Sequence, residues 1–343
     1  MVSRIAPLSL QSHTIYSDGN LSPESQIRFL HRVYNKKTKG KTPGPLIAFT
    51  DHDHTGAANH VKSLASELNM TVLQGGEYSI RVYDKDGALH KMHATVLFPQ
   101  DDKKQSKILE AELKEMVKRV EKSRIALARE TLEKLEDKGW STQYVDRDDV
   151  LDGRTITKAK IARALFYDGN NSAMLGRLKI KSALQLRELI VLPNSELTRH
   201  LITCDELARI AHKHQGYVVI AHPYLPNKPN PMPALDVLTA KNNGEKIDFG
   251  ETLYPHLLGK LLGTSRELTK YFYDRGVVPV VSSDIHNTET EYHETKKLHA
   301  LYDNQQPITD RILKMADGNN EAAKFLKPGL LGYKNNNRRG NRR

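Results

Sequence analysis

The segment PLIAFTDHDH, residues 45–54, shows the pattern from which the fold can be read. An apolar run of strand length is followed at once by four ionisable side chains. The same order recurs in YVVIAHP (217–223), which ends in His-Pro, and in VVPVVSSDIH (277–286), which ends in Asp-Ile-His. A short apolar run bounded by polar residues is consistent with a buried strand, and a parallel α/β barrel presents the C-terminal ends of its strands on one face. We therefore predict an α/β barrel with its functional site on that face.

Two further strand ends fit this pattern. The apolar residues 8–10 lead to His13 and Asp18, and TVLQGG (71–76) leads to Glu77. A single histidine after a strand is usually a hydrogen-bonded loop residue, but that explanation does not cover five strand ends at once. Imidazole and carboxylate together bind divalent transition metals, and two ions can share one site. The sequence therefore predicts a multinuclear metal site.

The middle of the chain has a different character. Apolar residues recur at helical spacing over 101–138, Gly139 is a plausible helix C-cap, and a second helix is expected at about 156–168. Near the N-terminus, Ser22-Pro23 predicts a helix start, and that helix should run to about Asn35. The predicted division is a first barrel part (1–100), a helical insertion or cap (101–200), the remainder of the barrel (201–325) and a basic, disordered tail (326–343).

Composition sets broad limits on function. The 343 residues are 38% hydrophobic and 27% charged, as in a soluble globular protein, and no apolar run is long enough to span a membrane. The formal net charge of +11 suggests anionic partners, although five of these charges lie in the last ten residues, KNNNRRGNRR. One cysteine, Cys204, cannot form an internal disulfide, and its helical surroundings predict a core thiol. The N-terminus turns polar too early for a signal peptide, so we predict a cytoplasmic protein.

At this point the sequence resembles the polymerase and histidinol phosphatase (PHP) superfamily. The resemblance rests on an ordered set of short motifs over about residues 8–290, none of them specific alone. The matching residues are Gln11-Ser12-His13-Thr14 with Ser17-Asp18-Gly19, Thr50-Asp51-His52, Gly75-Gly76-Glu77, His93, Ala221-His222-Pro223 and Ser283-Asp284-Ile285-His286. The resemblance implies a distorted (β/α)7 TIM-like barrel of the PHP type, with two or three divalent ions that are Mn, Zn or Fe, or else Mg.

The resemblance also implies how the ligands are shared. The first ion would be held by His13, Glu77 and Asp284 with Gln11 as a questionable fourth ligand, the second by Glu77, His93 and His222, and the third by Asp18, His52 and His286. His90 is an alternative to His93 if the hairpin register differs, and His54 is a second alternative ligand. Asp51 and Asp53 would orient neighbouring ligands.

Gln11 is the main departure from the family pattern, which has histidine at this position. A glutamine carbonyl oxygen is a poorer ligand for transition metals than imidazole. The corresponding ion position is therefore expected to be weak, differently occupied or absent, and two ions would still suffice for hydrolysis.

The insertion resembles the helical cap of the nucleotide and oligonucleotide phosphoesterases of this family, which include 3′,5′-nucleoside bisphosphate phosphatase and the exonuclease RNase AM. The Arg-x-His-Ile-Ala-Arg element of that branch reads Lys158-Ala159-Lys160-Ile161-Ala162-Arg163 here. Lys158, Lys160 and Arg163 could hold substrate phosphate, and the alternative is a solvated helix face. His256 is a further candidate for substrate contact.

The predicted function is hydrolysis of phosphate esters of nucleotides or short single-stranded oligonucleotides by a metal-activated hydroxide, with Asp284 and His222 as the catalytic candidates for moving protons. Two alternatives remain open: a histidinol-phosphatase-like phosphomonoesterase, and a nucleic-acid-binding PHP module with a degenerate site. The basic tail could contact nucleic acid without reading its bases. The absence of Gly-x-Gly-x-x-Gly after a strand and of Gly-x4-Gly-Lys-Ser/Thr argues against nicotinamide and P-loop enzymes.

Overall fold

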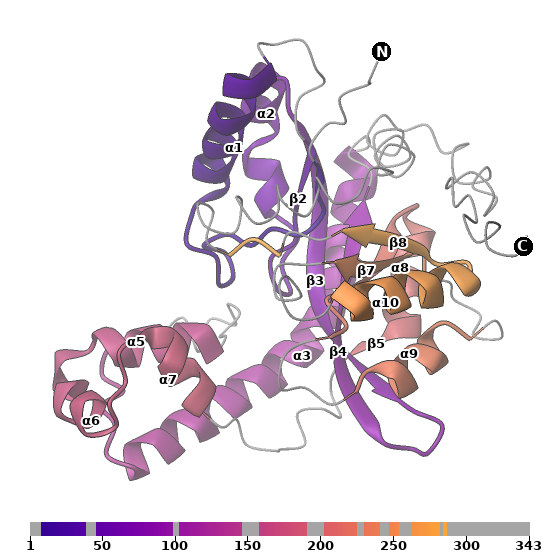
Figure 1. Ribbon diagram of the computed structural model, residues 1–343. Helices are drawn as coiled ribbons and strands as arrows, with labels where there is room; N and C mark the ends of the chain where they lie inside the picture. The colour runs from indigo at the N-terminus through magenta and orange to yellow at the C-terminus, as the bar shows by residue number, and fades with distance from the viewer. Residues whose placement is uncertain are drawn as a thin grey trace, which may run out of the picture.

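The computed structural model describes residues 8–38, 46–98, 103–145, 158–190, 202–224, 230–240, 247–253, 262–281 and 284–286. One sheet organises this part of the chain (Figure 1). Its strands follow the order β1-β2-β3-β4-β6-β7-β8, with β5 paired to β3 off this path. The strands are β1 (Leu8–Ser9), β2 (Leu46–Phe49), β3 (Thr71–Tyr83), β4 (Leu89–Phe98), β5 (Ile202–Thr203), β6 (Tyr217–Ala221), β7 (Phe249–Leu253) and β8 (Val278–Val281).

Most neighbouring strands are parallel, but β4 runs antiparallel to both β3 and β6. Strands β3 and β4 form a long hairpin, so the strict strand–helix repeat is broken there. The hairpin register pairs Ser79 with His93 and Val82 with His90. Because successive side chains of a strand alternate between its two faces, His90 and His93 point to opposite faces, and only one of them can face the barrel site.

The two ends of the sheet approach each other beyond β1 and β8. Ser12 and Ile285 form a parallel bridge, and the His13 amide donates to the Ile285 carbonyl oxygen at 2.8 Å. The Asn20 amide donates to the His286 carbonyl oxygen at 3.1 Å. The sheet therefore curls back on itself, an α/β arrangement compatible with the predicted TIM-like barrel.

Alternate strand residues fill the inside of this curl. The inner cluster takes one or two side chains from the neighbourhood of each main strand: Leu10, Ala48, Leu73, Leu97, Tyr217, Val219, Phe249 and Val280. Their neighbours in sequence pack outwards, as Val218 and Ile220 do in β6 and Ile47 and Phe49 do in β2. This period of two separates an inner core from the layer beneath the helices.

Helices cover the outer face. They are α1 (Pro23–Thr38), α2 (Lys62–Glu67), α8 (Cys204–Lys213), α9 (Met232–Leu238) and α10 (Leu262–Asp274), together with the 3₁₀ turn η1 (Ala57–His60). The predicted start of α1 is confirmed, because the Ser22 hydroxyl accepts from the Ser25 amide at 3.2 Å and Pro23 is the first helical residue. The helix ends at Thr38, three residues later than predicted.

The long helix α3 (Lys103–Asp137) runs from the sheet to a separate group of helices (Figure 1). It contributes to two hydrophobic cores. Its first half packs Leu109 and Leu113 against the barrel. Its second half packs Leu132 and Leu135 against a separate helical layer made of α5 (Lys158–Tyr167), η2 (Gly169–Asn171), α6 (Ser172–Arg177) and α7 (Ala183–Leu189). Gly139, with φ of +82°, lies just beyond its end, as the sequence indicated. We refer to α5–α7, residues 158–190, as the cap.

Cys204 begins α8 and is buried in the core between the sheet and its helices. Burial raises the pKa of its thiol to about 12. The predicted core thiol is confirmed. Among the described residues, no helix is both long and apolar enough to cross a membrane.

We expect Cys204 to resist thiol reagents in the folded protein. At pH 8 almost none of the thiol is ionised, and the reactive thiolate is the attacking form. Titration with a chromogenic disulfide should give fewer than about 0.1 thiols per chain before denaturation and one afterwards. Rapid labelling of the folded protein would show that the α8 N-terminus opens readily.

Candidate metal centre

The residues predicted to bind metal come from six places along the sheet and gather at one end of it. They are His13 and Asp18 after β1, His52 after β2, Glu77 in β3, His93 in β4, His222 after β6, and Asp284 and His286 after β8. Backbone pairing fixes part of this convergence, since His52 and Glu77 form a parallel bridge and His93 pairs with Ala221, the residue before His222.

Glu77 lies at the centre of the group and is fully buried. Its two carboxylate oxygens face different partners. Oε2 lies 3.0 Å from His13 Nε2 and also accepts a hydrogen bond from the Gln11 side-chain amide. Oε1 lies 3.1 Å from His222 Nε2 and contacts His93 Nδ1. A carboxylate placed in this way can bridge two cations.

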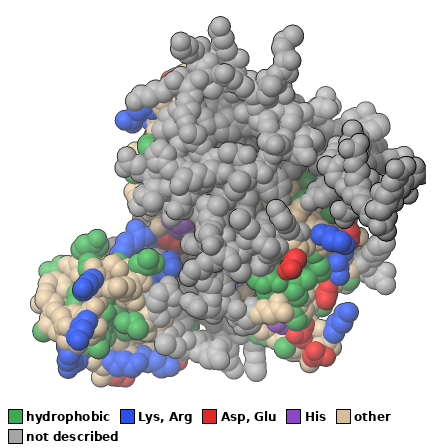
Figure 2. All heavy atoms as spheres, viewed as in Figure 1, with side chains coloured by type: hydrophobic (Ala, Val, Ile, Leu, Met, Phe, Trp, Pro, Cys, Tyr) green, Lys and Arg blue, Asp and Glu red, His purple; other side chains and the backbone are tan. Residues whose placement is uncertain are grey.

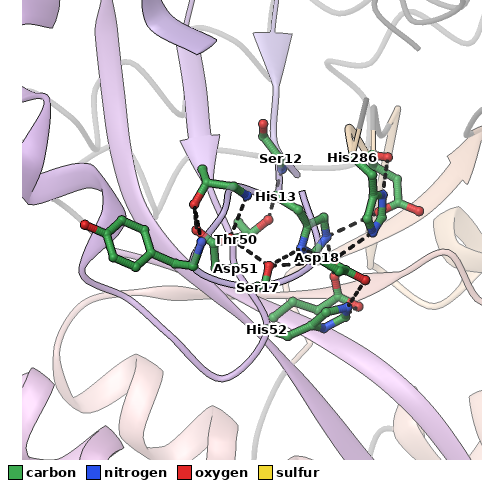
Figure 3. A network of polar contacts seen from close by, with 12 residues as sticks. Ser12, His13, Ser17, Asp18, Thr50, Asp51, His52 and His286 are labelled. Atoms are coloured by element: carbon green, nitrogen blue, oxygen red, sulfur yellow. Dashed lines mark hydrogen bonds and ion pairs between the residues drawn. The ribbon is translucent and has the colours of Figure 1, made fainter. Parts of the chain in front are cut away.

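A second group surrounds Asp18 (Figure 3). Asp18 Oδ1 lies 3.3 Å from His286 Nε2 and 3.6 Å from His13 Nδ1, and Oδ2 lies 3.7 Å from His52 Nε2. The rings of His13 and His286 stack with centroids 4.2 Å apart. Figure 3 shows side chains from the N-terminal quarter of the chain beside His286, which lies more than two hundred residues later in the sequence.

These residues fit divalent cations by donor type and by arrangement. Three overlapping groups have ligand atoms within 4.8 Å of one another: His13-Asp18-His52-His286, His52-Glu77-His93 and His13-Glu77-Asp284. His13 Nε2 and His93 Nδ1 are buried without a hydrogen-bond partner, although carboxylate oxygens lie beside them. Buried polar atoms normally have hydrogen-bond partners, so nitrogen atoms left in this state point to a cation as the missing partner.

The histidines of the group differ in charge state. Burial lowers the pKa of His52 to about 3 and also lowers the pKa of His93, so both rings are neutral and keep a lone pair. Burial alone would raise the pKa of Glu77, but neighbouring histidines, the charged His222 among them, hold it well below its ordinary value. Burial opposes a charge on His222, yet Asp284 and Glu77 raise its pKa to about 10. Asp284 also raises the pKa of His13 and of His286 against the effect of burial. A cation that binds beside these three rings must displace their protons.

The loop that carries His13 and Asp18 is held by Asp51. Its carboxylate accepts hydrogen bonds from the Thr14 amide at 2.6 Å, the Thr14 hydroxyl at 2.8 Å and the Ser17 hydroxyl at 2.7 Å. The loop turns tightly at Gly19, where a Cβ atom would lie 2.2 Å from the His13 carbonyl oxygen. Asp51 was predicted to orient ligands, and the structure places it against this loop.

Two residues of the group have an unusual backbone. His222 and Asp284 have φ of +25° and +42°, values that residues other than glycine rarely adopt. The His222 amide donates to Glu251 Oε2 at 2.6 Å, which helps to hold this conformation. Residues held in sparsely populated backbone conformations cluster at functional sites, so these outliers point to the same site as the side chains.

Sequence reasoning missed two supporting side chains. Glu251, in the middle of β7, is fully buried and anchors His222. Gln26 in α1 donates to the His13 carbonyl oxygen at 2.6 Å and accepts from the Ser12 hydroxyl. The only signal for Glu251 was that KIDFGETLY, like the other apolar runs, ends in polar residues. Nothing in the sequence around Gln26 distinguished it from a solvent-exposed helical residue.

The alternative ligands lie elsewhere. His90 pairs with Asp84 at 2.7 Å near the turn of the hairpin, so the hairpin register places His93 in the group instead. The His54 ring stacks on Tyr16 with centroids 4.9 Å apart, and its Nδ1 accepts from the Gly56 amide at 3.2 Å. Burial raises the pKa of the Tyr78 hydroxyl, and the negative charge of Asp53 raises it further.

Of the candidates for holding substrate, Arg163 in α5 reaches the metal loop, where its Nη2 donates to the Asp18 carbonyl oxygen at 2.6 Å. Lys160 lies on the same helix, one turn earlier and partly buried. Lys158 is the first residue of α5, but its side chain lies outside the described part of the structure. His256 also lies outside the described residues.

Comparison with solved structures supports the fold. An amidohydrolase from Chromobacterium violaceum, solved with bound sulfate and without metal, aligns with a TM-score of 0.61 at 19% identity over 83% of this chain and 89% of its own. A protein from Bifidobacterium adolescentis for which metal-dependent phosphoesterase activity is proposed aligns with a TM-score of 0.56 at 17% identity over 83% of this chain and 90% of its own. No protein-family model matches the sequence, and no curated protein matches it.

Proposed function

We propose that this protein is a metal-dependent phosphoesterase that hydrolyses phosphate esters of nucleotides or short oligonucleotides, of the 3′,5′-bisphosphate nucleotide phosphatase or 5′–3′ exonuclease type. The observation that carries the proposal is the buried carboxylate of Glu77, which faces imidazoles from several different strands. Burying these charged and polar groups costs free energy, and cations that bind to them offset that cost. The fold neighbour with proposed phosphoesterase activity supports the same class of reaction.

The chain supplies the ligands and their orientation. Divalent cations bound here would activate water and neutralise phosphoryl charge. Glu77 belongs to two of the three ligand groups and would hold them together. Asp51 would fix the loop of His13 and Asp18. We assign proton movement to Asp284 and His222, which both lie within the group and have their side chains directed by unusual backbone angles.

The cap supports a substrate that carries phosphate. Its residues 158–190 include seven Lys or Arg and two acidic residues, and Figure 2 shows blue side chains spread over it at lower left. Arg163 carries this positive charge to the loop of the metal centre. A fold neighbour was solved with bound sulfate, an anion that resembles phosphate in shape and charge. A guanidinium can bind two phosphate oxygens at once, so Arg163 is the residue we assign to the substrate phosphate.

Substituting Arg163→Ala is expected to raise KM for a nucleotide substrate about tenfold, the loss of one charge-assisted hydrogen bond, with a smaller change in kcat. Steady-state kinetics would measure the split. The KM of Arg163→Lys should fall between those of wild type and Arg163→Ala, because lysine keeps the charge but loses the forked guanidinium donors. Arg177→Ala, which removes an exposed cap arginine, is the matched control. Equal effects from Arg163→Ala and Arg177→Ala would contradict a specific role for Arg163.

Two alternatives make different predictions. A histidinol-phosphatase-like enzyme would favour a small phosphomonoester, and a degenerate nucleic-acid-binding module would bind without hydrolysing. Assembly of the metal centre opposes the second alternative, whereas Gln11 and the basic tail, which lies outside the described residues, favour it. Metal analysis of the purified protein separates these possibilities when it is combined with hydrolysis assays. The substrates would be a nucleoside 3′,5′-bisphosphate, a 5′-phosphorylated oligonucleotide and histidinol phosphate, each with and without Mn²⁺.

A further inference from the structure

The side chain of Gln11 is fully buried and takes part in the metal centre in a way that the motif alone does not show. Its Nε2 donates a hydrogen bond to Glu77 Oε2, the oxygen that also faces His13 Nε2. The opposite oxygen, Oε1, faces His93 and His222 instead. This hydrogen bond from Gln11 therefore acts on one of the two Glu77 oxygens.

The chemistry of the amide decides what this contact does. An amide nitrogen that donates a hydrogen bond offers no lone pair to a cation. The amide N–H also directs a partial positive charge at Glu77 Oε2, where a cation would otherwise approach. The group on this side thus keeps only three ligand residues, His13, Glu77 and Asp284, and has to share Glu77 with the group on the other side.

The other two groups are better supplied. The outer group has four members, His13, Asp18, His52 and His286. The Oε1 group has His52, Glu77 and His93, and His222 lies beside it at 3.1 Å from the same oxygen. With His222 counted, the Oε2 group has three ligand residues against four in each of the others, and its shared oxygen accepts the Gln11 hydrogen bond.

We propose that Gln11 is a positioning residue that orients Glu77, and that the His13-Glu77-Asp284 group consequently binds its cation weakly. The protein then holds two divalent ions tightly and a third only at high concentration. This inference rests on the metal dependence in the proposed function and adds the number of ions and the cause of that number.

The test counts ions without measuring catalysis. Full-length protein is stripped with a chelator, reloaded with Mn²⁺ or Zn²⁺, passed through a desalting column and analysed for metal per chain. Competition with a fluorescent chelator then gives the affinities. Wild type should retain about two ions. Gln11→His, which supplies a ring nitrogen, should retain a third with at least tenfold tighter binding than the third ion of wild type.

Two further variants separate the roles of ligand and positioning residue. Gln11→Met removes the donor without adding a ligand, and it should retain two ions with about tenfold weaker affinity, the usual cost of losing a residue that orients a ligand. Gln11→Glu adds a carboxylate oxygen and should recover the third ion, which keeps the test open if Gln11→His folds poorly. Gln185→His adds an imidazole to an exposed cap position and controls for surface binding.

Three tight ions in wild type would overturn the inference while leaving the proposed function in place. The same would follow if Gln11→His and Gln11→Glu both folded and retained only two ions. Protein that binds no ion in any variant would overturn both the inference and the proposed metal dependence.

Discussion

Replacing Glu77 with glutamine is expected to lower the phosphoesterase kcat/KM by at least about a thousandfold and to remove the tightly bound ion of the His52-Glu77-His93 group. Glu77 supplies an oxygen to each of two ligand groups, and its charge balances the imidazoles around it. Glutamine has nearly the same shape, so packing should survive. It has only one coordinating oxygen and no charge, and preorganised electrostatic groups of this kind are worth several kcal/mol in the transition state.

The measurement pairs kinetics with metal content on the same samples. Glu67→Gln, an exposed glutamate at the end of α2, is the matched control and should behave as wild type. Circular dichroism checks that the fold is retained. Normal metal content in Glu77→Gln would show that the ions are held without the bridging carboxylate, which is incompatible with the geometry of the centre.

Asp284→Ala is expected to abolish metal-dependent activity while the protein still folds, and His52→Ala should do the same. Asp284 Oδ1 lies 3.4 Å from His13 Nε2 and 3.7 Å from His286 Nδ1, so its loss removes one of the carboxylates that these two imidazoles share. His52, like His13, connects the Asp18 group to Glu77, with its ring nitrogens 3.7 Å from Asp18 and 3.9 Å from Glu77. Each change should therefore disturb more than one ion position.

The positive φ of Asp284 requires a second variant. Asparagine tolerates this backbone conformation better than alanine, so Asp284→Asn separates loss of the carboxylate from backbone strain. Both variants should be inactive, with Asp284→Asn the more stable in thermal unfolding. Asp274→Ala, at an exposed position in α10, serves as the control. Full activity of Asp284→Ala or His52→Ala with metal supplied would refute the assignment.

Sequence reasoning placed much of the centre correctly in space because strand ends share a location in this kind of fold. His13, His52, Glu77 and Asp284 each follow or end an apolar run, and parallel pairing brings them together. Their roles as ligands remain predictions. The choice between His90 and His93 could not be made beforehand, because it depends on the register of β3 and β4, and a shift of one residue reverses the facing of a strand.

Other features depend on tertiary contacts that no local pattern encodes. The donor role of Gln11 follows from the position of Glu77, sixty-six residues away in the chain. The anchoring of His222 by Glu251 depends on the register of neighbouring strands. The end of α1 was misplaced because Lys36 and Lys37 suggested a loop, whereas both residues are compatible with helix.

The contact of Ser12 with Ile285 also bears on how the protein matures during synthesis. A chain that emerges from the ribosome presents His13 and Asp18 early, but their partners Asp284 and His286 appear only after more than two hundred further residues. The cation sites cannot be complete until the two edges of the sheet meet, a contact of high sequence separation that is expected to form slowly. Loading with metal would then be a late event in biogenesis, and the supply of free metal would determine how firmly the edges stay joined.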